Sequence, residues 1–569
     1  MKNSSPQRLA KQTAASPLHW LRSGEPMIWF NAAAVSISLI AVVGLIGLLA
    51  VRGFGHFWPA AILQGTLYSA ESSLSLIGES VEQLEVSGQQ LREAGFTLKG
   101  DGPFFGRTLL KQGNRDFLGN DFVWIIDEQL EDISYPPEVL LVERLEWGNL
   151  YGFLRTVSRN GELLADLNED AQATWRIFQQ EIDNSLAIRK EIHALERVEI
   201  GHINHALERL RLRERQAELD GDMSPQLQEE LLSARSEQNA QYKTLQAELA
   251  VLYGSMEGIE YSVDLANGQR VSLPLSKVVR AYRPNDMDIF DKSAMYLERL
   301  WEFLSAEPRE ANTEGGVFPA IFGTVMMVLL MSIIVTPFGV VAAVYLREYA
   351  RQGFVTQIIR VAVNNLAGVP SIVYGVFGLG FFVYFIGGEL DQVFFPAALP
   401  SPTFGTPGLM WASLTLALLT LPVVIVATEE GLARIPRAVR EGSLALGATR
   451  AETLWRIVLP MASPAMMTGL ILAVARAAGE VAPLMLVGVV KLAPALPLDG
   501  NYPFIHLDQK FMHLGFHIYD VGFQSPNVEA ARPLVYATAL LLVGLIALLN
   551  LTAVALRNRL REHYKSLDN

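Results

Sequence analysis

Residues 317–345 read VFPAIFGTVMMVLLMSIIVTPFGVVAAVY and contain no charged side chain. The hydrocarbon core of a bilayer is about 30 Å thick, and a helix of roughly 20 apolar residues crosses it while satisfying its own backbone hydrogen bonds. Five further stretches meet this test, over residues 28–51, 361–386, 408–428, 463–490 and 533–556. The sequence therefore predicts an all-α polytopic membrane protein with six transmembrane helices.

The composition supports this class and excludes others. Half of the 569 residues are hydrophobic, and the formal net charge is −13. The acidic residues are concentrated between residues 53 and 310, and nothing indicates a nucleic-acid partner. The chain has no cysteine, which excludes disulfides, thiol nucleophiles and metal sites with Cys ligands.

The first apolar stretch resembles a secretory signal because Lys2, Arg8, Lys11 and Arg22 precede it. Its apolar run is too long for a signal, and Leu49-Ala50-Val51-Arg52 is not a small-residue cleavage site. We therefore expect residues 28–52 to be a retained membrane helix that follows a tail at 1–27.

Basic residues near the ends of the stretches predict their orientation, because Lys and Arg are retained on the cytoplasmic side. They cluster after the second, fourth and sixth stretches, as Arg347, Arg351, Arg360, Arg434, Arg437, Arg440, Arg450, Arg456, Arg557, Arg559, Arg561 and Lys565. The prediction is a bacterial inner-membrane protein with cytoplasmic tails at 1–27 and 561–569. It places residues 53–314 in the periplasm and a five-helix membrane domain at 315–560.

The predicted periplasmic insertion has α+β character. Strand and turn patterns come first, at Phe122–Ile126 and at Asn160-Gly161, and a tight β-hairpin is predicted around Asn267-Gly268. Between them, apolar residues recur every three or four positions over about 172–253, interrupted at residues 220–225. This pattern predicts a long antiparallel helical hairpin.

Two histidine pairs have spacings that place both rings on one helix face, His202 with His205 and His513 with His517. Neither pair has an HExxH glutamate or a third ligand nearby, so the sequence favours solvated surface histidines over metal ligands. No metal site and no cofactor are predicted.

A spaced motif lies between the fourth and fifth apolar stretches. It reads Glu441-Gly442-Ser443, three residues, Gly447, nine residues, then Ile457-Val458-Leu459-Pro460. This resembles the EAA motif of binding-protein-dependent ABC importer permeases, with Gly442 and Ser443 in place of the usual two alanines. Small exposed side chains allow another protein to approach a helix backbone closely, Gly447 permits a turn, and Pro460 marks entry towards the fifth span.

The resemblance implies a type I ABC importer permease domain over 315–560, whose loop at Glu441 to Pro460 docks on a separate cytoplasmic ATPase. The alternative is an ordinary basic cytoplasmic loop. No Gly is followed directly by Lys anywhere in the chain, so no P-loop is present. We therefore expect a non-catalytic subunit, with ATP hydrolysed by a partner.

Further segments are similar to phosphate permeases of the PstA family. They are residues 316–324, 344–349, 366–375, 428–432 and 475–484. The resemblance covers roughly 315–560 and implies three kinds of partner: a second, PstC-like permease subunit, PstB-like ATPase subunits and a PstS-like periplasmic phosphate-binding protein. The insertion at 53–310 departs from the family form. Two alternatives remain, an importer of another oxyanion or small solute, and a membrane-anchored sensor that uses the insertion.

Two ionisable residues are predicted well inside the fifth helix, Arg476 and Glu480, one turn apart. Charges at that depth are expensive and are by default functional, and a guanidinium offers several directed donors to a tetrahedral oxyanion. We therefore expect both residues to line the substrate path. The alternative is a structural pair that bridges helices. Asn364, Asn365 and Ser371, predicted in the third helix, either line the path or pack.

Overall fold

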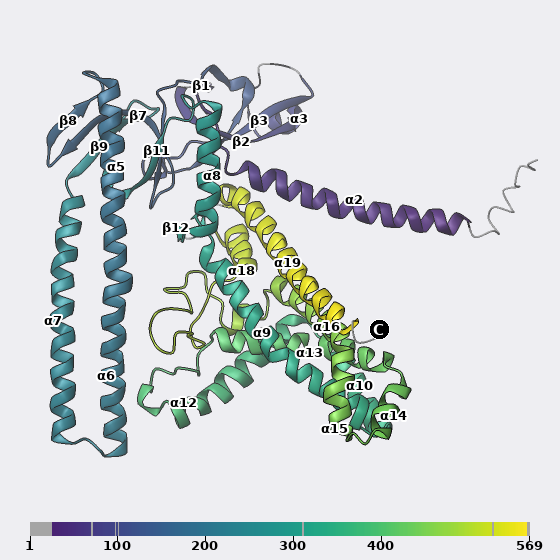
Figure 1. Cartoon of the computed structure of the whole chain (residues 1–569). Coiled ribbons are helices and arrows are strands. Elements are labelled where there is room, and N and C mark those ends of the chain that lie inside the picture. The colour runs from purple at the N-terminus through teal and green to yellow at the C-terminus, as the bar shows by residue number, and fades with distance from the viewer. Residues whose placement is uncertain are drawn as a thin grey trace, which may run out of the picture.

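The computed structural model describes residues 25–69, 72–96, 98, 100, 102–309, 312–525 and 528–565. The predicted tail at 1–27 lies outside this part apart from its last three residues, as do residues 566–569 of the predicted C-terminal tail. Figure 1 shows three regions: a sheet-containing region, a long helical hairpin beside it, and a bundle of helices.

Six helices in the described part are long and apolar enough to cross a membrane, which confirms that prediction. They are α2 (Glu25–Gly55), α9 (Phe318–Val344) with the π-helical η5 (Tyr345–Tyr349), α11 (Ser371–Phe377) with η6 (Gly378–Gly387) and α12 (Gly388–Phe394), α13 (Leu409–Arg434), α15 (Arg450–Thr453) with η8 (Leu454–Val458) and α16 (Leu459–Gly479), and α19 (Val528–Lys565).

The predicted limits of the third span, 361–386, are wrong. A separate amphipathic helix, α10 (Phe354–Leu366), ends before it, and the span begins at Ser371. Pro370 causes the break, because its ring lacks an N–H and disfavours helical geometry in the preceding residue. Asn364 and Asn365 therefore lie in α10 and not in the membrane span.

The predicted limits of the fifth span, 463–490, are also wrong. The helix runs from Arg450 to Gly479, and Pro460 lies in the first turn of α16. It ends at Gly479, and the next residue, Glu480, has an extended backbone with ψ of 133°. A short helix, α17 (Leu484–Val487), comes next.

α13 lies at the centre of the bundle and packs against α9 and α16. Small residues bring the helices together: a Cβ on Gly469 of α16 would lie 2.7 Å from the Cβ of Ala427, and one on Gly431 would lie 2.4 Å from the Cβ of Ala465. Such close backbone approach is how membrane helices gain van der Waals contact where lipid offers no hydrophobic driving force.

Two antiparallel sheets form the region that we call the sheet domain. The first has the order β4-β3-β2-β1-β5 and the second the order β10-β9-β7-β6-β11, with β8 paired to β7. The predicted strand at Phe122–Ile126 (β4), the turn at Asn160-Gly161 and the β-hairpin around Asn267-Gly268 are confirmed. The remaining strands are β1 (Ile62–Ser69), β2 (Ser72–Ser87), β3 (Phe104–Lys111), β5 (Leu130–Ser134), β6 (Leu140–Arg144), β7 (Leu150–Arg159), β8 (Glu162–Asp166), β9 (Ile259–Asp264), β10 (Arg270–Pro274) and β11 (Val278–Tyr282).

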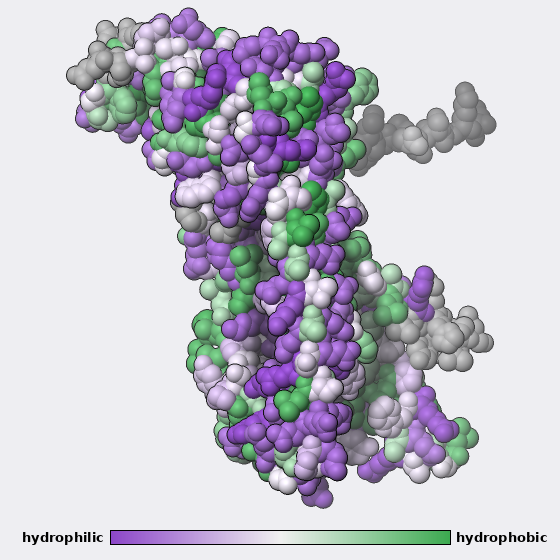
Figure 2. All heavy atoms as spheres, turned by 90° about the vertical axis from the view of Figure 1, so that its left-hand side faces the viewer, coloured by the Kyte–Doolittle hydropathy of each residue, from purple (hydrophilic) through white to green (hydrophobic). Residues whose placement is uncertain are grey.

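The helical hairpin consists of α5 (Ala171–Ala194), η2 (Leu195–Glu199) and α6 (Ile200–Asp220), which run on from one another, and α7 (Pro225–Met256), which returns. Asp170 and Ser224 cap α5 and α7 at their N-termini, and Gly221 ends α6 with a left-handed φ of 72°. The face of the molecule on the hairpin side is largely hydrophilic (Figure 2).

The hairpin also contacts the bundle region. His202 Nδ1 lies 2.8 Å from Asn501 Oδ1, and α6 lies beside the 3-10 turn at Pro396–Ala398. Residues 396–398 and 501 belong to the loops that follow the third and fifth spans. One arm of the hairpin therefore braces two loops that are far apart in the sequence.

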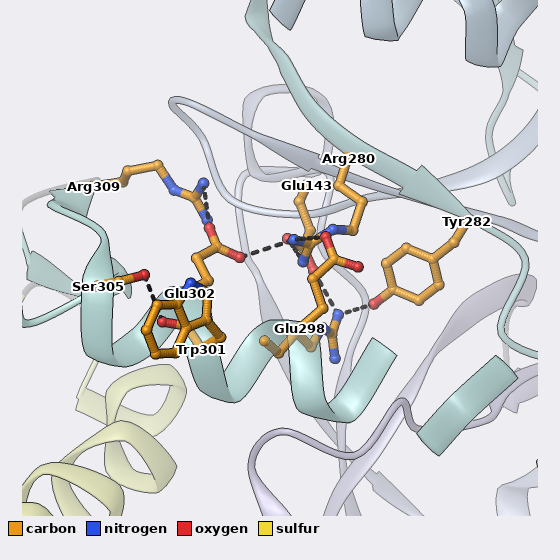
Figure 3. A network of polar contacts seen from close by, with 9 residues as sticks. Glu143, Arg280, Tyr282, Glu298, Trp301, Glu302, Ser305 and Arg309 are labelled. Carbon is orange, nitrogen blue, oxygen red and sulfur yellow. Dashed lines mark hydrogen bonds and ion pairs between the residues drawn. The ribbon is translucent and has the colours of Figure 1, made fainter. Parts of the chain in front are cut away.

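A helix that precedes the second span, α8 (Ile289–Ser305), joins the sheet domain to α9 through an ionic network (Figure 3). Glu143 on β6 accepts from Arg299 at 2.5 Å and lies 3.4 Å from Arg280. Arg280 on β11 also reaches Glu302 at 2.9 Å and Glu298 at 3.0 Å. Glu143 opposes two guanidinium groups. Although burial of Glu143 raises the pKa of its carboxyl, Arg299 and Arg280 outweigh it and hold this pKa below its ordinary value.

We expect Glu143→Gln to destabilise the junction between the sheet domain and α8 by about 3 kcal/mol, because it removes the carboxylate that pairs with the half-buried Arg299 and one of the three carboxylates that pair with Arg280. Glu298→Gln is the matched control, since that carboxylate bonds the same Arg280 but is 63% exposed. Hydrogen exchange of β6, β11 and α8 in the purified chain measures the loss of stability in both variants. In the wild-type chain, the Glu143 carboxylate contributes fully to the stability of the junction above pH about 4.3. This contribution is lost as the pH falls through the lowered pKa of Glu143. Equal protection in both variants would contradict this account.

Candidate functional site

The motif predicted to dock the ATPase forms a helix and a turn. The helix α14 (Arg437–Ala445) ends at Leu446, and Gly447 has a left-handed φ of 89°. Its N–H donates to Leu444 O, and the N–H of Ala448 donates to Ser443 O. The turn therefore uses the conformation that glycine adopts at lowest cost. We call residues 437–449 the α14 loop.

Ser443, one of the two small residues of the motif, is a buried anchor and is not part of the exposed surface. Its side chain is 7% exposed, and its Oγ lies 2.9 Å from Thr453 Oγ1 on α15. Thr449 caps α15 through a reciprocal capping box with Glu452. These contacts hold the two short helices against one another.

Arg440 fastens the α14 loop to the bundle, a role that no sequence pattern indicated. Its guanidinium donates to Ile435 O and Leu432 O, each at 2.8 Å, and pairs with Glu348 Oε1 at 2.8 Å. Ile435 and Leu432 lie at the end of α13, and Glu348 lies in η5 after α9. One side chain thus connects the loop to the ends of two spans.

The other motif residues divide between surface and core. Glu441 and Gly442 are exposed, and the apolar side chain of Leu446 is 91% exposed. Leu459 is buried, while Ile457 and Pro460 are half-buried. Leu459 packs in a cluster at the ends of α9, α13 and α16, made of Val344, Leu432, Ile435, Leu454, Val458, Leu459 and Ala462. The exposed turn therefore stands on a packed base.

The two ionisable residues of the fifth span lie at its end. Arg476 is in the last turn of α16, and Glu480 is the first residue after it, so the prediction that both lie well inside one helix is wrong. They still face one another, with Arg476 Nε 3.5 Å from Glu480 Oε1. Arg476 is 34% and Glu480 21% exposed. Arg476 Nε is buried and makes no hydrogen bond.

The segment after Glu480 packs tightly on the third span. A Cβ on Gly375 would lie 2.7 Å from Pro483 Cα, and one on Gly378 would lie 3.0 Å from Val487 Cγ1. Tyr374 on α11 donates to Leu366 O at 2.6 Å across the break at Pro370. The Arg476–Glu480 pair therefore lies where two interrupted helices meet, and interrupted helices in membrane proteins line cavities or protein interiors.

The histidine pairs differ from one another. His202 is exposed, but His513 and His517 are 1% and 2% exposed, so the prediction that they are surface residues is wrong. Both lie at α18 (Leu514–Tyr519), which packs against α9 and α19. Burial lowers the pKa of each imidazole to about 4. Among the described residues, no three His, Cys, Asp or Glu side chains are grouped to hold a metal ion.

Six helices long and apolar enough to cross a membrane, with the exposed α14 loop between two of them, define a multi-pass membrane protein. Residues 335–562 match the family of binding-protein-dependent transport system inner membrane components. The phosphate transport system permease protein PstA 1 of Mycobacterium tuberculosis (strain CDC 1551 / Oshkosh) is 35% identical over 43% of this chain and 71% of its own length. The chain belongs to this permease family, among its PstA-type members, and is a non-catalytic multi-pass membrane component of an ABC importer.

Two other proteins extend the comparison. The probable ABC transporter permease protein YqgH of Bacillus subtilis (strain 168) is 33% identical over 35% of this chain, which spans only 62% of that relative. A solved structure of the inward-facing MetNI methionine ABC transporter covers 46% of this chain and 98% of its own, with 18% identity and a TM-score of 0.32. That structural likeness adds nothing to the assignment.

We expect Arg440→Gln to loosen the α14 loop, because it removes an ion pair and weakens two charge-assisted bonds to carbonyls worth about 1.5–3 kcal/mol each. Amide exchange over 437–449 should accelerate by about tenfold or more, while exchange within α13 and α16 stays slow. Arg437→Gln, at an exposed arginine of the same helix, is the control. Unchanged exchange in the Arg440 variant would show that packing alone holds the loop.

Proposed function

We propose that this chain is one half of a heterodimeric membrane path for inorganic phosphate. Its partners would be a second, PstC-like permease subunit, PstB-like cytoplasmic ATPase subunits and a PstS-like periplasmic binding protein. The observation that carries the proposal is the α14 loop, an exposed turn fastened by Arg440 and Ser443 to the ends of three spanning helices. The similarity to PstA proteins supports phosphate as the substrate.

The α14 loop has the properties that a coupling element needs. Leu446 and the small Gly442 offer a surface on which another protein can seat, and Glu441 offers a charge. The turn is attached to η5, α13 and α15, so a displacement of the loop is passed to several helices at once. A loop that was held only by its own chain ends would move without displacing those helices.

The orientation follows from the same loop. If the ATPase is cytoplasmic, the α14 loop faces the cytoplasm, and the sheet domain, at the other end of the bundle in Figure 1, lies in the periplasm. Both termini are then cytoplasmic, in a bacterial inner membrane. The basic residues Arg434, Arg437 and Arg450 around the loop support this orientation.

Arg476 and Glu480 are proposed to line the phosphate path. Arg476 is one-third exposed, so part of its guanidinium is open to an anion, while its buried Nε faces Glu480. Glu480 at 3.5 Å would limit how tightly an anion is held. Conduction requires binding that is favourable enough for entry and weak enough for release.

We expect Glu441→Lys and Gly447→Asp to abolish phosphate uptake while membrane insertion is retained. The first reverses an exposed charge on the docking surface, and the second forces a side chain into a left-handed φ. Glu248→Lys, an exposed charge reversal on α7, is the control and should transport normally. The measurements are labelled-phosphate uptake and copurification of the ATPase; wild-type uptake by both loop variants would remove the basis of the proposal.

A second series of variants separates the effect of the positive charge at Arg476 from the effect of its side-chain geometry. Arg476→Gln should reduce uptake at least about a hundredfold, in the range seen when one stabilising group is removed from an anion site, whereas Arg476→Lys should keep partial uptake because the charge survives. If the pair is only structural, the Arg476→Leu, Glu480→Leu double variant restores assembly and transport together. Uptake per assembled complex decides between the two, and full transport by the double variant would exclude a guiding charge.

A further inference from the structure

The helix α8 has three faces, and two of them are occupied within the chain. On the first, Tyr296, Leu300 and Phe303 pack in a cluster with Phe57, Val317 and the start of α19. On the second, Arg299 and Glu302 enter the ionic network with Glu143 and Arg280. The helix is therefore fixed in its rotation about its own axis.

The third face of α8 is apolar and uncovered. Phe290 is 80% exposed, Leu297 64% and Trp301 69%, and the exposed Ala294 lies between them. Their positions advance by four, three and four residues, which places all of them on one side of the helix. We call these residues the α8 stripe. Steps of four and three are those of the seam along which two helices pair.

No rotation of α8 would bury the α8 stripe against the part of the chain that the structure describes. Turning it inward would break the ionic network and expose Phe303, which is 4% exposed. Single exposed apolar residues are ordinary, but a continuous stripe with two aromatic rings on a fixed helix marks a surface that another molecule covers.

The charges beside the α8 stripe discriminate between possible occupants. Asp291 and Glu298 are exposed, whereas the basic residues of α8, Lys292 and Arg299, are half-buried on the far side of the helix. Helices that lie in a membrane surface carry Lys and Arg beside their apolar face. A second copy of this chain would bring carboxylates against carboxylates. The charges therefore favour a protein helix with basic residues flanking its apolar seam.

The connection to the membrane bundle indicates which protein carries that helix. The N–H of Val317 donates to Phe303 O and that of Phe318 to Ala306 O, so the end of α8 is bonded directly to the start of α9. A subunit permanently paired with the membrane helices is held at high effective concentration beside α8. A binding protein that docks and leaves would meet a more polar surface, since apolar contacts are typical of permanent interfaces.

We propose that the α8 stripe pairs with an apolar, basic-flanked helix of the second permease subunit, outside the membrane spans. The contact rests on the proposed heterodimer and adds an interface between the two subunits that the sequence motifs do not contain. Its consequence is that the sheet domain, bonded to α8 through Glu143 and Arg280, is part of the subunit interface and not a separate appendage.

The test places a benzophenone amino acid at Leu297, and separately at Trp301, in the full chain expressed with the second permease subunit and the ATPase. After illumination, we expect an adduct with the combined mass of both permease chains, mapped by mass spectrometry to a helix outside the partner's spans. Val251, an apolar residue that is 72% exposed on α7, is the control position and should give no such adduct.

A second arm measures assembly. Leu297→Glu should lower recovery of the partner subunit by about tenfold or more, equivalent to about 1.4 kcal/mol. Leu297→Met is the control and should keep this recovery at the wild-type level. Amide protection of β6 in both variants shows that the sheet domain is folded. Adducts with lipid or with a second copy of this chain, or no adduct although the partner copurifies, would overturn the interface and leave the proposed function standing. If no second permease subunit copurifies with the wild-type chain, both fail.

Discussion

The close packing of α13 against α9 and α16 is the constraint on which the membrane bundle depends. Gly431 and Gly469 allow backbone approach at two levels of the α13–α16 contact, and a side chain at either would collide with a neighbouring Cβ. In lipid, helices gain little from burying apolar surface and associate through close contact. The ends of α13 are thereby fixed, and Arg440 finds the carbonyl oxygens of Leu432 and Ile435 at bonding distance.

One continuous helix connects the two candidate sites. It begins at Arg450, directly after the α14 loop, and ends at Gly479, three residues after Arg476. The loop and the Arg476–Glu480 pair therefore lie at opposite ends of one helix. The π-helical turn at Leu454–Val458 lies between them, and such turns are frequent at functional sites.

The sheet domain is attached to the bundle by several independent contacts. The ionic network holds α8 on the sheets, and α6 braces the loops after the third and fifth spans. Arg532 at the start of α19 pairs with Glu82 on β2 at 3.1 Å. Since these contacts involve both sheets, the hairpin and three separate parts of the bundle, the domain and the bundle are positioned together.

Features that depend on local pattern could be predicted from the amino-acid sequence alone. Apolar runs fixed the number of spans, the alternation around Asn267-Gly268 fixed a β-hairpin, and the spacing from Glu441 to Pro460 located the α14 loop. Tertiary structure decided the rest. Glu348, the ion-pair partner of Arg440, lies 92 residues away in the sequence, and the burial of His513 and His517 depends on α9 and α19. Hydropathy averages over a window, so it missed the break at Pro370, where the local backbone geometry set by proline outweighs apolar composition, and the helix end at Gly479.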